Sequence, residues 1–151
     1  MGSMTPDSND TERAITALIE VTRQGFLSLD PQLLASIWDH QHEPLIYVAQ
    51  EEEEPLRGWA AIQTYYAALP AHLDAVLAKE IDGVRIDPLG NAAAAFFKFR
   101  STVRLKGREA LHQPTGRVTM IFHRTASDWR AIHYHESALG ALAAQAKSGS
   151  Q

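Results

Sequence analysis

The spacing of apolar residues changes once along this chain of 151 residues, and the change constrains the fold more than any other feature. In three segments up to residue 69, apolar residues recur three or four positions apart, which is typical of amphipathic helices. From residue 84 onward the spacing becomes two, which is the period of β-strands. Helices followed by a run of strands predict an α+β fold, with the helices packed on one face of a sheet.

Three segments of the first part predict helices. In the first of them, Ile15 and Ile19 share a face with other apolar side chains. Asp30 followed by Pro31 supplies an N-cap and a first-turn proline for a short second helix. The predicted helices cover residues 10–29, 31–38 and 59–69; Pro70 interrupts the third, and residues 72–79 are expected to continue as a helix.

Strands are predicted where apolar or alternating segments lie between turn residues. They cover residues 45–49, 84–87, 92–105, 109–124 and 129–138. Turn-like residues at 88–91, 106–107 and 126–128 suit hairpins between the long strands. A single domain is expected over residues 10–140, with residues 1–9 as a cloning scar and disordered N-terminus and residues 141–151 as a polar C-terminal tail.

Composition argues against several classes of function. The 14 Lys and Arg residues are scattered and the net charge is −4, so nucleic acid is not expected as a partner. No apolar run approaches the roughly 20 residues that cross a bilayer, and no secretory signal opens the chain, so a cytoplasmic protein without a membrane partner is predicted. Because the chain has no cysteine, its chemistry must come from His, Tyr, Arg, Lys and carboxylates.

Three segments carry a resemblance to a known superfamily. They are residues 56–58, which open a helix, and residues 119–124 and 129–137, which close the sheet. With this order of elements, the chain resembles the nuclear transport factor two-like superfamily over residues 10–140, and most closely SnoaL-like proteins and the association domain of calcium/calmodulin-dependent protein kinase. The resemblance implies a cone-shaped, curved antiparallel sheet wrapped around the N-terminal helices, also called a cystatin-like or ketosteroid-isomerase-like roll.

The same resemblance indicates which side chains of the final strand face a pocket. Alternation puts Arg130, Ile132, Tyr134 and Glu136 on one face, and Ala131, His133, His135 and Ser137 on the other. The kinase association domain has a cavity arginine at the position that matches Glu136. This match implies that Tyr134 and Glu136 point inward.

Two further expectations extend that assignment to the neighbouring strands. A hairpin loop at residues 126–128 would pair Phe122 with Ile132, Met120 with Tyr134, and Val118 with Glu136. Arg100 matches a second cavity arginine of the association domain, and Phe96 and Lys98 share its face. The resemblance therefore implies a cationic pocket wall on the strand over residues 92–105.

Glu136 is the predicted acid/base residue, with Tyr66 or Tyr134 stabilising oxyanion charge and Arg100 holding an anionic group. Tyr66 matches a tyrosine of the ketosteroid isomerase hydrogen-bond network. The alternatives are a buried Arg100–Glu136 pair that only satisfies its own charges, and tyrosines that belong to the core. Further predicted ligand-binding residues are Lys98, Tyr47, Tyr65, Trp38, Trp59, Met120, Phe122 and His40.

Steroid isomerisation itself is not expected. The positions that match that enzyme's base and two oxyanion donors hold Ala49, Thr22 and, nearby, Thr115. None of these side chains supplies the required carboxylate, tyrosine or acid.

The histidines allow a metal hypothesis. His123, His133 and His135 could converge on zinc or nickel, but half-buried histidines on the face away from the pocket are the favoured interpretation, and neither a metal nor a cofactor is predicted. His40 and His42 are expected near the pocket mouth, either in proton transfer or as an exposed loop pair.

Three classes of function remain open. The first is a cofactor-free lyase, isomerase or cyclase acting on a small aromatic or polyketide-like molecule. The second is a non-catalytic ligand-binding or oligomerisation module, and the third is a structural dimer without a cavity. A homodimer is expected because an apolar outer sheet face is predicted, made of Ala93, Ala95, Phe97, Phe99, Val103 and Ile121.

Overall fold

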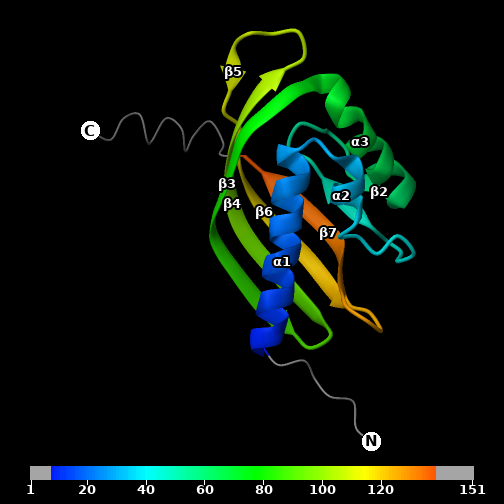
Figure 1. The fold of residues 1–151 in the computed structure, drawn as a ribbon. Helices are drawn as coiled ribbons and strands as arrows, with labels where there is room; N and C mark the ends of the chain where they lie inside the picture. The colour runs from blue at the N-terminus through cyan, green and yellow to red at the C-terminus, as the bar shows by residue number, and fades with distance from the viewer. Residues whose placement is uncertain (1–7, 139–151) are drawn as a thin grey trace, which may run out of the picture.

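A computed structural model describes residues 8–138 and shows three helices against one curved sheet (Figure 1). The helices are α1 (Ser8–Leu27), α2 (Pro31–Ala35) and α3 (Trp59–His72). The strands are β1 (Ile46–Val48), β2 (Leu56–Arg57), β3 (Leu73–Leu89), β4 (Ala92–Leu105), β5 (Leu111–His112), β6 (Thr115–Arg124) and β7 (Trp129–Ser137). The predicted tails at residues 1–9 and 141–151 lie almost wholly outside the described residues.

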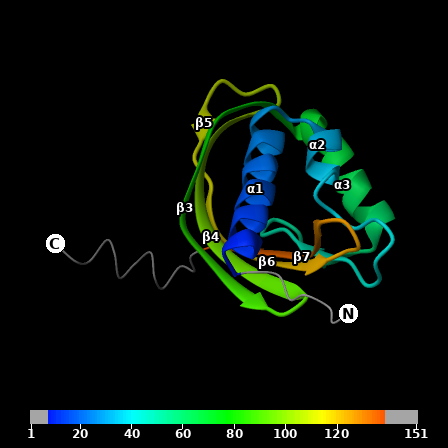
Figure 2. The same cartoon turned by 60° about the horizontal axis from the view of Figure 1, so that its bottom comes forward.

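The sheet has the order β2-β1-β7-β6-β4-β3, with β5 paired to β4. It curves around α1, which lies on its concave side (Figure 2). All pairings are antiparallel except that between β1 and β7, so the sheet is mixed rather than purely antiparallel. The predicted α+β cone is confirmed.

The segment after α3 was predicted as a helix, and this prediction is wrong. The backbone turns extended at Leu73 and continues as β3, which pairs with β4 from Leu73 opposite Leu105 to Leu89 opposite Ala92. Three register shifts interrupt this pairing and obscure the alternation that marks a strand. The expected strand over residues 109–124 is divided at Pro114, because proline cannot donate to the ladder.

The predicted phase of β4 is reversed. Its buried side chains are the odd-numbered ones, whereas Lys98 and Arg100 are exposed on the convex face. Burying a charged group without a partner is costly, so these two cations set the phase of the strand. The residues predicted to form an apolar outer face, Ile121 excepted, therefore belong to the core or border the interior. The homodimer stays a prediction that has lost this premise.

The final hairpin confirms most of the expected pairing. Met120 lies opposite Tyr134 and Val118 opposite Glu136, as predicted. Phe122 pairs with Ala131 instead of Ile132, because the register shifts between residues 121 and 122. Before this shift, Trp129 and Ala131 are the buried residues of β7, and after it Tyr134 is buried. The inward orientation predicted for Arg130 is thus wrong, whereas that for Tyr134 is confirmed.

The helices are fixed by local sequence signals and by packing. The Asp30 side chain accepts hydrogen bonds from the N–H groups of Gln32 and Leu33, which is the predicted N-cap of α2. Gly25 allows α1 and α2 to approach closely, since a Cβ there would come within 2.7 Å of the Leu34 side chain. Within residues 8–138, no helix is both long and apolar enough to cross a membrane.

Candidate functional site

A cavity of about 920 Å³ lies at one end of the concave face of the sheet. Its wall is built from the C-terminal end of α1, the segment that follows β1, one face of α3, the start of β3, and the second half of β4. Most of the wall is apolar, with side chains such as Phe26, Leu69, Val76, Phe99 and Val103. A cavity of this size and lining is typical of sites for small organic molecules.

Lys79 on β3 is a buried cation in this wall, and sequence reasoning missed it. Its side chain is only 8% exposed. The Nζ atom lies 3.4 Å from Ser101 Oγ, 3.9 Å from the centroid of the Phe99 ring and 4.6 Å from that of Phe26. Burial lowers the pKa of Lys79 to about 8, although the Glu136 carboxylate works in the opposite direction.

Glu136 on β7 faces the same cavity, as predicted. Its Oε1 accepts a hydrogen bond of 2.8 Å from the Tyr134 hydroxyl, and its Oε2 accepts a longer bond of 3.4 Å from the Gln50 N–H. Burial raises the pKa of Glu136, and the Glu51 carboxylate raises it further, outweighing the opposite effects of Tyr134, Lys79 and Gln50. A carboxyl group whose pKa is raised in this way is suited to accept and return a proton.

Tyr65 on α3 is the second predicted residue that lines the cavity. Its hydroxyl donates a short hydrogen bond to Oε1 of Glu51, which also lines the cavity. Burial and this carboxylate raise the pKa of Tyr65. The Tyr65 hydroxyl is therefore a neutral donor that is held by its neighbour.

The other predicted tyrosines belong to the packed core. Tyr47 and Tyr134 stack with ring centroids 4.3 Å apart, and both are at most 2% exposed. The Tyr66 hydroxyl accepts a hydrogen bond of 3.0 Å from Trp38 Nε1. Burial raises the pKa of all three tyrosines. Tyr134 contacts the site only through its hydrogen bond to Glu136. Tyr47 and Tyr66 are core residues, which was the alternative to a ligand-binding role.

The remaining predicted ligand-binding residues lie away from the cavity wall. Met120 and Phe122 have no exposed surface, and they fill the core. His40 stacks on Trp59 at a centroid distance of 3.8 Å, with its Nε2 2.8 Å from the Ala35 carbonyl oxygen. Arg100, like Lys98, is on the opposite face of the sheet, so its predicted ligand-binding role is wrong and the alternative Arg100–Glu136 pair does not form.

The sequence signal that could have located Lys79 is the alternation of residues 79–82. As a strand, this segment places Lys79 and Ile81 on one face and the two acidic residues between and after them on the other, as the burial shows. Because a helix was predicted over residues 72–79, this alternation was not interpreted as part of a strand. The cationic wall that was expected from Arg100 on β4 is supplied by Lys79 on β3.

Gly116 on β6 packs directly against Phe99, a residue of the cavity wall. It pairs with Phe99 of β4, and a Cβ at this glycine would lie 2.4 Å from Phe99 Cε1. The aromatic ring thus occupies the space that a side chain would take. This places the ring beneath the Lys79 ammonium.

A second cluster of titratable side chains lies outside the cavity wall. His123 Nε2 is 2.8 Å from Asp39 Oδ2, and the rings of His42 and His123 meet edge to face at 4.7 Å. Partial burial opposes ionisation of Asp39, but hydrogen bonds from His123 and the Gln41 N–H keep its pKa below the usual range. Within residues 8–138, Asp39, His42 and His123 offer three potential metal-ligand atoms within 4.8 Å of one another. The metal hypothesis that was not favoured grouped His123 with His133 and His135, whereas in the structure His123 lies with Asp39 and His42.

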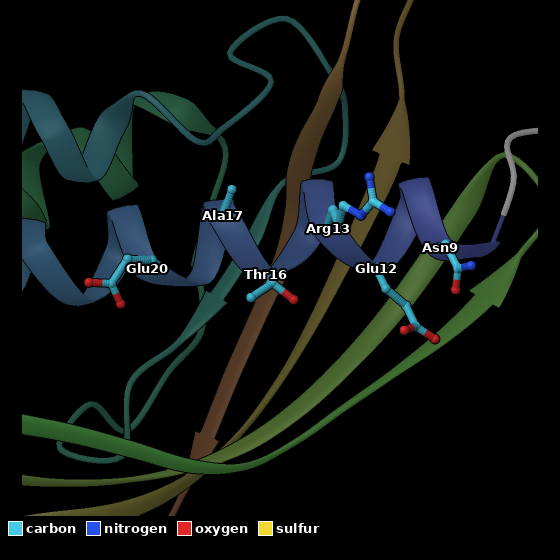
Figure 3. Close-up of a pocket in the computed structure, with 6 residues that line it drawn as sticks. All are labelled: Asn9, Glu12, Arg13, Thr16, Ala17 and Glu20. Atoms are coloured by element: carbon cyan, nitrogen blue, oxygen red, sulfur yellow. The ribbon is translucent and has the colours of Figure 1, made fainter.

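A shallow groove of about 510 Å³ runs along the exposed face of α1 (Figure 3). Six residues line it: Asn9, Glu12, Arg13, Thr16, Ala17 and Glu20. Glu20 is paired with Arg23, whose hydrogen bonds lower the Glu20 pKa to about 2. All these residues come from one helix surface that faces solvent, and no group among them is arranged for chemistry.

Comparison with known proteins agrees with this fold. The family model of the SnoaL-like domain matches residues 13–141. A nuclear transport factor 2-like superfamily protein from Salmonella enterica serovar Typhimurium LT2 superposes with a TM-score of 0.78 at 20% identity, over 89% of this chain and 94% of that one. A protein with a cystatin-like fold from Caulobacter vibrioides gives 0.73 at 19% identity, over 89% and 94%. A hexachlorocyclohexane dehydrochlorinase from Novosphingobium barchaimii LL02 gives 0.73 at 12% identity, over 86% and 87%. No curated protein sequence matches the chain significantly.

Proposed function

The chain belongs to the SnoaL-like domain family, and from that premise we propose that it is a cofactor-independent lyase or isomerase acting on a small aromatic or polyketide-like molecule. One observation carries the proposal. The buried Lys79 and the carboxyl group of Glu136 line the same mainly apolar cavity, and they are close enough to affect each other's pKa. Opposite charges in a hydrophobic cavity can separate charge within a bound molecule.

Glu136 acts as the proton carrier in this proposal. Its Oε1 is held by the Tyr134 hydroxyl at 2.8 Å, whereas Oε2 has only the long contact with the Gln50 N–H. Oε2 is therefore the oxygen that is free to remove a proton from a carbon next to a carbonyl group. The protonated carboxyl then returns that proton to a second carbon or to a leaving group.

Lys79 stabilises oxyanion charge in this proposal, which is the role that was predicted for Tyr66 or Tyr134. Removing a proton from carbon places negative charge on the neighbouring carbonyl oxygen, and a buried ammonium stabilises such an oxyanion more strongly than an exposed one. Tyr66 and Tyr134 were predicted for this function, but the core encloses them. Lys79 lines the cavity, whereas the single hydroxyl proton of Tyr65, which also lines it, is donated to Glu51.

The structural neighbours support this class of reaction only in a general way. The protein from Novosphingobium barchaimii is named a dehydrochlorinase, which is a lyase-type activity, but its 12% identity transfers the fold alone. The proposal therefore depends on the geometry of this chain's own residues.

Hydrogen–deuterium exchange tests the proposal without knowledge of the substrate. Aryl ketones such as acetophenone are incubated with the protein in D2O, and exchange of the protons next to the carbonyl group is followed by NMR. We expect catalysed exchange that falls by about 10²-fold in Glu136→Gln, while ketone binding is retained. Glu80→Gln, on the exposed face of β3, is the matched control and should exchange at the wild-type rate.

Two outcomes would contradict this function. Undiminished exchange in Glu136→Gln would remove the proposed base. Binding of ketones without any exchange would instead favour the non-catalytic ligand-binding alternative.

A further inference from the structure

Lys79 has an unusual environment for a lysine side chain. Its Nζ is enclosed by the rings of Phe26 and Phe99, and its hydrogen bond to Ser101 Oγ is long, at 3.4 Å. It forms no salt bridge within residues 8–138. Phe26, Phe99 and Ser101 all line the cavity, so the amine is at the cavity surface rather than inside the packed core.

Burying the charged form of Lys79 in this environment costs free energy. A buried ammonium without a paired carboxylate destabilises the folded protein, and replacing it by an apolar residue would remove that cost. Ordinary packing therefore does not explain the lysine. Desolvation in an apolar pocket is, however, a recognised way to make a lysine amine nucleophilic, because it favours the uncharged form.

We propose that Lys79 binds carbonyl compounds covalently, as an imine formed with an aldehyde or ketone inside the cavity. This inference deepens the proposed function and rests on it for the use of the same cavity. It defines the ligand class as small, mainly apolar molecules that carry a reactive carbonyl group. The aromatic and aliphatic wall residues would contact the rest of such a ligand.

The reaction needs no oxidant or reductant. The uncharged Nζ attacks the carbonyl carbon, so that a C–N bond forms while the carbonyl π electrons move to the oxygen, and one proton passes from the nitrogen to that oxygen. The resulting carbinolamine loses its hydroxyl group as water when the protonated Glu136 carboxyl supplies a proton to it. The nitrogen lone pair then forms the C=N bond of a protonated imine, and the Glu136 carboxylate takes back one proton from the nitrogen when the neutral imine forms, so that the net products are one imine and one water molecule.

The surroundings of Nζ suit the protonated imine as well as the amine. An iminium is positively charged, and it would lie against the same faces of Phe26 and Phe99 that now face the ammonium. It also withdraws electrons from the adjacent carbon. Glu136 could then remove a proton from that carbon more easily than from the free ketone.

Reductive trapping tests the inference directly. The full-length protein is incubated with benzaldehyde and sodium cyanoborohydride at about pH 8, near the pKa of Lys79. Intact mass and peptide mapping then count and locate the N-benzyl adducts. We expect Lys79 to be modified at least tenfold faster than Lys98 and Lys106, which lie outside the cavity.

Variants separate a specific adduct from general lysine reactivity. Lys79→Arg keeps the positive charge and should abolish the fast adduct, whereas Lys98→Arg should leave it unchanged. Circular dichroism verifies that each variant folds. Trapping that is no faster at Lys79 than at the two exposed lysines would overturn the inference.

Phenol, which has no carbonyl group, distinguishes failure of the imine from failure of the site. If the inference is correct, excess phenol should slow trapping at Lys79 but not at Lys98. If phenol binds and Glu136-dependent exchange of acetophenone protons persists without a Lys79 adduct, the imine is refuted and the proposed function stands. If phenol does not bind, exchange does not occur and no adduct forms, both fail together.

Discussion

The concave side of the sheet has a packed half and an open half, and β4 contributes to both. In the packed half, side chains such as Trp38, Tyr47, Phe97 and Phe122 are at most 2% exposed. The open half is the cavity, to which the same face of β4 contributes Phe99, Ser101 and Val103. The β4 side chains of both halves lie on the same face of the strand and are buried. Other side chains fill the space next to this face in only one of the halves.

The difference between the halves lies in the chemistry they tolerate. The packed half holds aromatic rings, and two of them, Trp38 and Tyr66, share a hydrogen bond. The open half holds Lys79 and Glu136, both of whose pKa values are shifted by burial. Ionisable groups are thus gathered where the core is incomplete, which is where a ligand could use them.

The largest expected effect comes from removing the charge in the open half. Burial lowers the Lys79 pKa from 10.5 to about 8, so the unfolded chain binds this proton more tightly than the folded chain. Wild-type stability should therefore rise by about 3 kcal/mol between pH 8 and 10.5, and Lys79→Met should lack this rise. Below pH 8 the variant should be the more stable protein by about the same amount.

Urea unfolding at a series of pH values measures both parts of this expectation. Lys106→Met, at an exposed position on β4's connection to β5, is the control and should follow the wild-type pH profile apart from its surface ion pair with Asp74. If the free energies of unfolding of wild type and Lys79→Met had the same pH dependence, the Lys79 ammonium would not destabilise the folded protein.

A matched pair of valines compares the packing of the two halves. Val118 has no exposed surface and lies in the core, whereas Val103 borders the cavity. Val118→Ala should lower the free energy of unfolding by about 2 kcal/mol, because it removes methyl groups and leaves a void. Val103→Ala enlarges an existing cavity and should cost about 1 kcal/mol or less. Chemical denaturation of both variants gives the comparison, and equal losses would contradict the division into halves.

Tyr134 joins the two halves through its hydrogen bond to Glu136. That bond lowers the Glu136 pKa, so Tyr134→Phe should raise it further. Because a raised carboxyl pKa favours the protonated folded state, the variant should lose stability as the pH rises through that pKa. Carbon-13 NMR titration of the Glu136 carboxyl reports the shift, and a lowered pKa would show that Tyr134 does not stabilise the ionised form.

The smallest effect is expected at Arg100, which belongs to neither half. Its side chain is exposed on the convex face, so Arg100→Ala should change the free energy of unfolding by less than about 0.5 kcal/mol. The affinity of the Arg100→Ala protein for acetophenone or phenol should equal that of the wild type. Isothermal titration calorimetry checks this, and a tenfold weaker affinity would restore the original assignment of Arg100 to the cavity.

The order and type of most elements could be predicted from the sequence because periodicity is a local property. The helices around Ile15 and Ile62 and the strand that contains Glu136 occur close to where they were expected. The phase of β4 was predicted wrongly because both of its faces begin with alanine and phenylalanine. The charges of Lys98 and Arg100 indicate the correct phase, because unpaired charges face solvent. The resemblance to the kinase association domain instead implied that Arg100 faces the pocket.

The cavity itself could not have been predicted from the sequence. Whether Val103 and Phe99 meet other side chains or border an open space depends on the curvature of the sheet and the position of α3. Of the predicted site residues, Glu136 and Tyr65 line the cavity. Lys79 was missed because residues 73–79 belong to a strand that is fixed by long-range pairing with β4.

The contact between Gly116 and Phe99 has a consequence for how related sequences should vary. A side chain at position 116 would collide with the ring, so the two positions are expected to change together during evolution. Relatives with an aromatic residue at the position of Phe99 should retain glycine at the position of Gly116. Relatives with alanine or a larger residue at the position of Gly116 should have a residue smaller than phenylalanine at the position of Phe99. Such paired changes would alter the depth available to a ligand while leaving the rest of the domain unaltered.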